Sequence, residues 1–127
     1  IASCLVGSEM CIRDSHHLHH GLLNAVLLPY VLVANRSAIE RDAARLARYL
    51  ELDDPSFDGL LAWVLELRQR VGIPASLAQL GLTGEDAAQV GELAVADVSS
   101  SDTNALPLTA ADYSRIYRNA VAGILAG

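Results

Sequence analysis

All four histidines of this 127-residue chain lie within five consecutive residues, His16 to His20, which read HHLHH. A neutral imidazole offers a lone pair near physiological pH, and histidine is therefore the commonest metal ligand among the side chains. The cluster ends at Gly21, where a long apolar stretch begins, so a ligand at its end would be held against a core. The cluster marks a candidate metal site; an exposed loop or a disordered, tag-like end is the alternative interpretation.

A complete metal site needs three or four ligands. The sequence has no histidine after His20, so the helices that follow cannot supply a second imidazole. Any site that uses the cluster must draw its other ligands from elsewhere.

Residues 1–15 differ in composition from the rest of the chain. They contain both cysteines, Cys4 and Cys11, and the only methionine, and they follow neither a helical nor a strand period. Residues 5–15, LVGSEMCIRDS, resemble the translation of a transposon-end adapter used in sequencing libraries. We interpret residues 1–15 as a non-native, unstructured addition and expect the natural protein to extend further upstream. The alternative is a natural strand with a redox cysteine pair, although the spacing fits no zinc or thioredoxin motif.

From His16 onward the composition favours helices. Hydrophobic residues make up 52% of the chain but aromatic residues only 5%. Most of the apolar residues are alanine and leucine, which favour helices because they lose little side-chain freedom there. Residues 16–127 are predicted to form one all-α domain, a bundle of about five helices. The predicted helices are Gly21–Ala34, kinked at Pro29; a helix after Ser37; Phe57–Val71, closed by Gly72; a helix from about Thr83 or Asp86 to Val98; and a helix capped by Thr109.

Several details of these helices follow from local patterns. Ser37 and Glu40 are spaced as a capping box, and Ser99 to Leu108 is rich in turn formers and is predicted to be a loop. The apolar stripe of the third helix extends to its end and predicts that Leu67 and Val71 are buried. The stripe of the last helix predicts the same for Ile124. Asn24, a lone amide in an apolar helix, is expected to bond to a neighbouring backbone, a structural role that we favour over a catalytic one. Tyr113 and Tyr117 are expected to pack in the core, with hydroxyls reaching a wet edge.

The charge pattern excludes some classes of partner. Nine basic residues, all arginine, face fifteen acidic ones, for a formal net charge of −6, so no basic patch suits nucleic acid. The apolar run from Gly21 to Ala34 is too short to cross a bilayer comfortably, and no secretory signal is visible. We therefore expect a soluble, cytoplasmic protein without nucleic-acid or membrane partners.

The segment His20 to Pro29, HGLLNAVLLP, resembles the His-Gly-x-x-Asn-Ala-x-x-Leu-Pro motif of iron-containing, metal-dependent alcohol dehydrogenases. Ala34-Asn35 and the stretch Leu108 to Tyr113 match further. The resemblance covers about His16 to Gly127, roughly the last third of a family member. It implies the helical C-terminal domain of such an enzyme, with His20 as one metal ligand. His16, His17 and His19 occupy positions that the family does not use as ligands.

The same resemblance implies what the chain lacks. The family's other metal ligands, an aspartate and two histidines, and its nucleotide-binding domain lie upstream of the matched segment. The implied parent enzyme transfers hydride between a small alcohol or aldehyde and NAD or NADP, using a divalent metal, iron(II) first and zinc as the alternative. The fragment alone is expected to be inactive, with no catalytic or cofactor-binding residue of its own, and a homo-oligomer is compatible with the sequence. The loop around Ser99 departs from the family pattern; Ser99 is a candidate pocket residue.

Two interpretations from other classes remain open at this point. A helical interaction module would use exposed apolar faces to recruit a partner protein. A small metal-binding protein would use the histidine run itself.

Overall fold

The computed structural model describes residues 19–126, and within that range helices and the turns between them make up the chain, with no residue in a strand. This confirms the predicted all-α class and its five main helices. Residues 1–15, interpreted above as foreign, lie outside the described range. The elements are α2 (His20–Ala34), α3 (Arg36–Tyr49), α4 (Phe57–Arg70), the 3₁₀ turns η2 (Leu77–Leu80) and η3 (Gly84–Asp86), α5 (Ala87–Ala96), α6 (Val98–Ser101) and α7 (Ala110–Ala122).

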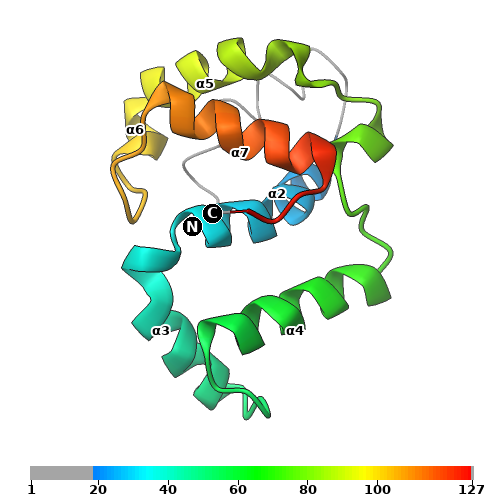
Figure 1. The fold of residues 1–127 in the computed structure, drawn as a ribbon, viewed down its shortest axis with the longest axis vertical. Helices are drawn as coiled ribbons and strands as arrows, with labels where there is room; N and C mark the ends of the chain where they lie inside the picture. Colours follow the sequence, from blue (N-terminus) through cyan, green and yellow to red (C-terminus); the bar gives the residue numbers. More distant parts are fainter. Residues whose placement is uncertain (1–18, 127) are drawn as a thin grey trace.

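The helices gather around two separate hydrophobic cores. In Figure 1, α5 and α7 lie side by side at the top, α2 lies beneath α7, and α3 and α4 form the lower part. We call the first cluster the α2–α5–α7 core; its buried residues are Leu23, Val26, Leu27, Tyr30, Val31, Leu77, Leu82, Ala87, Val90, Ala94, Tyr113, Ile116, Tyr117 and Ala120. We call the second the α3–α4 core; its buried residues are Leu32, Ile39, Ala43, Ala47, Phe57 and Leu60.

Small residues let α5 and α7 approach closely. A Cβ added at Gly91 would lie only 2.3 Å from the carbonyl oxygen of Ala110 and the Oγ of Ser114. The Ser114 hydroxyl is buried and donates to the carbonyl of Ala87 at 2.7 Å, so this polar group has a hydrogen-bond partner inside the close contact. At its start, α7 has a capping box between Thr109 and Asp112, which agrees with the predicted cap.

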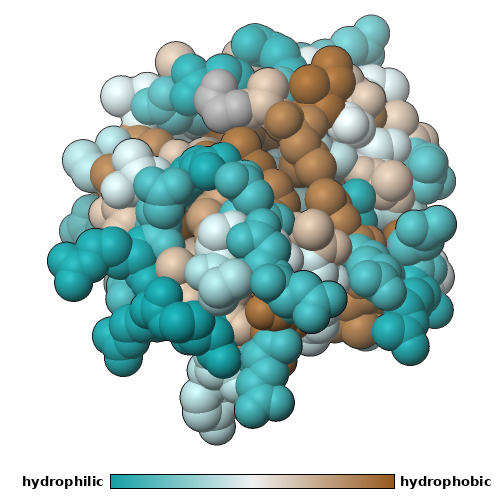
Figure 2. Space-filling model, turned by 60° about the horizontal axis from the view of Figure 1, so that its bottom comes forward, coloured by the Kyte–Doolittle hydropathy of each residue, from teal (hydrophilic) through white to brown (hydrophobic). Residues whose placement is uncertain are grey.

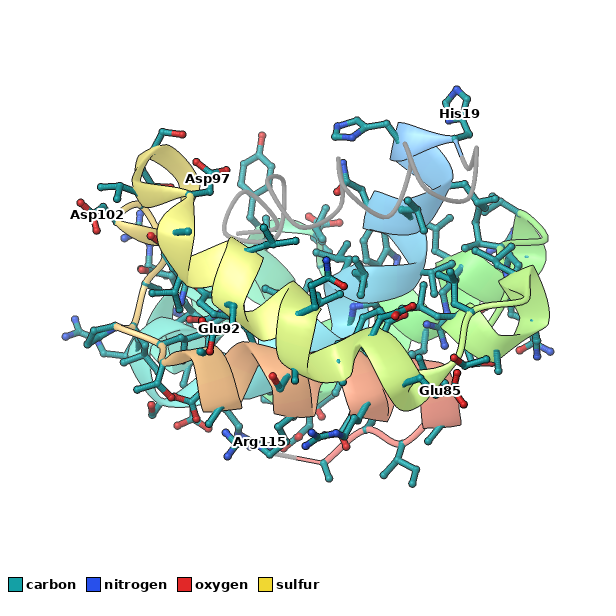
Figure 3. All side chains as sticks on the ribbon, turned by 90° about the horizontal axis from the view of Figure 1, so that it is seen from above. His19, Glu85, Glu92, Asp97, Asp102 and Arg115 are labelled. Carbon is teal, nitrogen blue, oxygen red and sulfur yellow. The ribbon has the colours of Figure 1, made fainter. Side chains whose placement is uncertain are left out.

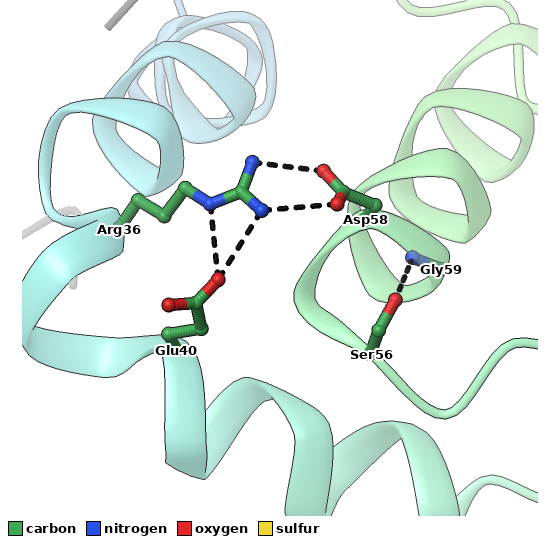
Figure 4. Close-up of polar contacts among 5 residues, drawn as sticks. All are labelled: Arg36, Glu40, Ser56, Asp58 and Gly59. Carbon is green, nitrogen blue, oxygen red and sulfur yellow. Dashed lines mark hydrogen bonds and ion pairs between the residues drawn. The ribbon is translucent and has the colours of Figure 1, made fainter.

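A polar cluster at the surface joins the two helices of the lower part (Figure 4). Both terminal nitrogens of Arg36 donate to the carboxylate of Asp58 at 2.9 Å, and its Nε donates to Glu40 at 3.2 Å. The guanidinium also lies 4.7 Å from the ring centroid of Phe57. The Ser56 hydroxyl caps α4 by accepting from the N–H of Gly59.

The chain turns by 110° between α2 and α3, with Asn35 as the single residue between them. Asn35 is fully buried: its Nδ2 donates to the carbonyl of Val31, and its Oδ1 accepts from Nδ2 of Asn104 at 2.8 Å. These bonds satisfy the amide inside the bend and tie the bend to the loop before α7. Helix α2 continues through Pro29 to Ala34, although proline supplies no backbone N–H.

Four local expectations are wrong. Ser37 is not a cap, because α3 begins at Arg36 and the Glu40 side chain binds Arg36 instead. A short helix, α6, occupies the start of the predicted loop. Leu67 and Val71 are exposed, because the helices that pack on α4 cover a narrower face than its apolar residues span. Ile124 is also exposed, because α7 ends at Ala122 and is followed by Gly123, which has a φ of +74°. The predicted end of α4 is confirmed, with Gly72 at a φ of +77°.

Figure 2, which brings the lower side of Figure 1 forward, shows a band of hydrophobic side chains between hydrophilic ones. Among residues 19–126, no single helix is long and apolar enough to span a membrane; the bent pair α2 and α3 reaches the required length and composition only when counted together.

Candidate metal centre

His20 is the first residue of α2, and its neighbour His19 explains why the helix starts there. His19 adopts an extended backbone conformation, and its Nδ1 accepts a hydrogen bond from the N–H of Gly21 at 3.1 Å. The ring therefore caps one of the backbone donors that a helix start leaves unpaired. This role for His19 was missed in the sequence, because histidine is not among the common capping residues.

The position of His20 is fixed by buried residues in the first two turns of α2. Leu23 and Val26 are fully buried in the α2–α5–α7 core, so the backbone that carries His20 cannot shift without disturbing that core. The His20 side chain is half-buried. Such a placement is what a preformed ligand position requires, and the ligand role of His20 stays a prediction.

The Asn24 side chain contacts His20. Its Nδ2 lies 3.2 Å from Nε2 of His20, and its Oδ1 is buried with no hydrogen-bond partner among the described residues. The expectation that Asn24 would bind a neighbouring backbone is therefore wrong. Residues four apart on a helix lie on the same face, so the spacing of His20 and Asn24 is the signal that could have revealed the pair.

The donor type fits a divalent metal, since imidazole suits both iron(II) and zinc. The number of donors does not complete a site: within residues 19–126, no group of three histidine, cysteine, aspartate or glutamate side chains could hold a metal ion. Figure 3 shows His19 projecting outward at the start of α2, well away from Asp97 and Asp102 near α6. His16 and His17 lie outside the described residues. Among the described residues, His20 is the one ligand that the family resemblance predicts, and its role stays a prediction.

The remaining candidates have structural roles in the described part of the chain. Tyr113 and Tyr117 pack in the core as expected, but the Tyr117 hydroxyl donates to the carbonyl of Thr83 at 3.0 Å and not to water at an edge. Burial, followed by the nearby carboxylate of Asp86, raises the pKa of Tyr117, so the hydroxyl remains a donor at neutral pH. Ser99 is exposed and donates to Asp97 at 2.6 Å; its place in a substrate pocket stays a prediction.

Comparison with known proteins extends this picture. Residues 10–121 match the C-terminal part of the Fe-containing alcohol dehydrogenase family. The match begins inside the segment 1–15 that we interpret as foreign. The chain is 38% identical to a 4-hydroxybutyrate dehydrogenase from Cupriavidus necator over 103 residues, which is 78% of this chain and 26% of that protein. It is 30% identical to an NADPH-dependent butanol dehydrogenase from Clostridium saccharobutylicum, over 64% of this chain and 25% of that protein.

Two solved structures share the fold. A 1,3-propanediol oxidoreductase superposes with a TM-score of 0.81 at 25% identity, covering 92% of this chain and 32% of the other. An alcohol dehydrogenase from Oenococcus oeni superposes with a TM-score of 0.76 at 26% identity, again over 32% of its length. The chain therefore spans about a quarter to a third of the length of these relatives.

Proposed function

Since the chain belongs to the Fe-containing alcohol dehydrogenase family, as its helical C-terminal part, we propose that it completes the metal site of an enzyme that oxidises small alcohols. The observation that carries the proposal is His20, placed at the first residue of a helix in which the side chains of Leu23 and Val26 are fully buried. Relatives named for 4-hydroxybutyrate and butanol support a small alcohol, or the matching aldehyde, as substrate.

The proposed reaction converts an alcohol and NAD⁺ or NADP⁺ into an aldehyde, the reduced cofactor and a proton. When bound, a metal ion such as iron(II) or zinc supplies Lewis acidity toward the alcohol oxygen, and the nicotinamide supplies the hydride acceptor. His20 contributes one neutral imidazole lone pair to this site. The core beneath α2 keeps the ring in place, because movement of Leu23 would open a cavity.

The other ligands and the nucleotide-binding region are proposed to lie in a longer polypeptide, upstream of the matched part. This chain alone is then inactive, because one ligand does not make a site and no hydride acceptor is held. A cytoplasmic location and a homo-oligomeric enzyme are further parts of the proposal that the family membership allows.

The test uses the gene region upstream of this sequence. We expect it to encode an Asp-x-x-x-His helix and a glycine-rich nucleotide-binding segment, and the longer polypeptide to reduce NAD⁺ or NADP⁺ with simple alcohols. His20→Ala should remove both bound metal, measured by elemental analysis, and turnover, whereas the control His17→Ala should keep both. A start codon directly before His16, or full metal content in the His20→Ala protein, would contradict the proposal.

The 127-residue chain provides a second test. Purified with ferrous ion, NAD⁺ and small primary alcohols, it should give no turnover above the protein-free background. Measurable turnover by the isolated chain would show that the site is complete without further residues.

A further inference from the structure

Two neighbouring histidines at the start of α2 use opposite ring nitrogens as hydrogen-bond acceptors. His19 accepts from the backbone N–H of Gly21 through Nδ1. His20 faces the side-chain nitrogen of Asn24 through Nε2 at 3.2 Å. An amide nitrogen can only donate, so the nitrogen that it faces must carry the lone pair and the ring proton must sit on the other nitrogen. With the Asn24 amide oriented as it is in the structure, the two contacts fit the Nε2–H tautomer of His19 and the Nδ1–H tautomer of His20.

Packing alone does not explain an asparagine at position 24. Its Oδ1 is buried without a partner among the described residues, and a buried amide oxygen left unbonded is unfavourable. The neighbouring positions on α2 are filled by Leu23 and Val26, which are fully buried. A leucine at position 24 would match this environment without an unsatisfied oxygen. The feature that only a side-chain amide donor supplies is the contact with the ring of His20.

We propose that Asn24 is a positioning residue that selects the Nδ1–H tautomer of His20 and keeps the Nε2 lone pair directed to the place where a cation binds. The proposal rests on the function proposed above, in which His20 is a metal ligand. The side-chain nitrogen of Asn24 faces Nε2 of His20, and a cation bound through Nε2 would take its place. In this way the ring enters the site already in the tautomer that coordination through Nε2 requires.

The test is to measure which nitrogen of each ring carries the proton, in the full 127-residue chain without metal. Long-range ¹H–¹⁵N correlation spectra at about pH 8.5, where an ordinary imidazole is neutral, distinguish the two tautomers directly. A His20→Gln variant identifies the His20 signals by their loss. We expect His20 to carry its proton on Nδ1 and His19, the internal control, to carry it on Nε2. A proton on Nε2 of His20 would overturn the proposal.

Two substitutions at position 24 separate positioning from packing. Asn24→Asp keeps the shape but replaces the donor with an acceptor, so the His20 proton should move to Nε2. Asn24→Leu removes both, and the ring should return toward the mixture of tautomers of an unrestrained histidine. His19 should be unchanged in both variants, which also shows that the start of α2 is intact. An unaltered His20 tautomer in both variants would contradict the proposal.

These measurements are independent of the metal content used to test the proposed function. If the Nδ1–H tautomer is absent while His20→Ala still strips metal from the longer enzyme, only the role of Asn24 fails. If the Nδ1–H tautomer is present but His20→Ala leaves the metal content of the longer enzyme unchanged, the proposed function is wrong, and the contact between Asn24 and His20 has a structural role only.

Discussion

The two cores of the molecule differ in how completely they are closed. In the α2–α5–α7 core, large side chains such as Tyr113 and Leu23 are fully buried, and α5 touches α7 at Gly91. The α3–α4 core is smaller, and on the same two helices Trp63 and Tyr49 remain 39% and 84% exposed. The candidate ligand His20 therefore lies on a helix that packs in the more closed core. Helices α3 and α4 should unfold locally at a lower free energy, because fewer buried contacts hold them.

A matched pair of leucine truncations tests this difference most strongly. Leu23→Ala should lower the free energy of unfolding by about 3 to 4 kcal/mol, because its cavity is closed on all sides, whereas Leu60→Ala should cost about 2 kcal/mol. Denaturant titration followed by circular dichroism measures both. Equal losses, or a larger loss for Leu60→Ala, would mean that the α3–α4 core is at least as closed as the α2–α5–α7 core.

Gly91 provides a sharper probe of the closed core alone. Gly91→Val should lower the free energy of unfolding by about 2 to 3 kcal/mol, because the new side chain meets the Ala110 carbonyl and Ser114. Gly84→Ala is the control, since a Cβ there meets no atom within 4 Å, and its effect should stay within about 0.5 kcal/mol. Thermal melting of the two variants side by side shows whether the spacing of α5 and α7 is as tight as described.

The same kind of helix cap occurs in both regions, so its removal allows the stability of the two regions to be compared. Thr109 caps α7, and Ser56 caps α4, each through its hydroxyl. Removing either cap by substitution with alanine should cost about 1 kcal/mol. In hydrogen-exchange measurements, Ser56→Ala should speed exchange in α3 and α4 only, whereas Thr109→Ala should affect α5 and α7 as well. The same exchange pattern in both variants would indicate a single cooperative unit.

The smallest expected effect depends on pH. The backbone N–H of Thr109, followed by its hydroxyl, lowers the pKa of Asp112 below its ordinary value of 3.8. A lowered native pKa contributes stability above the ordinary pKa, and this contribution is lost as the pH falls through the lowered value. Asp112→Asn should therefore be less stable than the wild type at neutral pH and should converge with it in strong acid. The deficit of Ser56→Ala should stay constant over the same range.

Periodic apolar residues were sufficient to predict the helical elements, because each main helix buries a stripe spaced at 3.6 residues. They could not predict how wide a face the neighbouring helices cover, and for this reason Leu67 was wrongly expected to be buried. The start of α3 was misplaced for a different reason. The helix begins directly after Asn35, whose buried side chain bonds to Val31 and Asn104. Because Asn104 lies 69 residues away in the sequence, the local pattern did not reveal this contact.

The candidate site divides in the same way. The position of His20 at the start of a buried helix followed from the sequence, because the histidines directly precede the apolar stretch. Its contact with Asn24 is local and could have been found from the spacing of four residues. The capping role of His19 could not, because it depends on the backbone conformation at the helix start.

Helix α2 supplies side chains to both cores: Leu27 and Val31 belong to one, and Leu32 belongs to the other. Neither half of the molecule can therefore be excised and transplanted on its own. A designer who wished to graft the α3–α4 pair onto another scaffold would have to carry α2 with it, together with the histidine at its first residue.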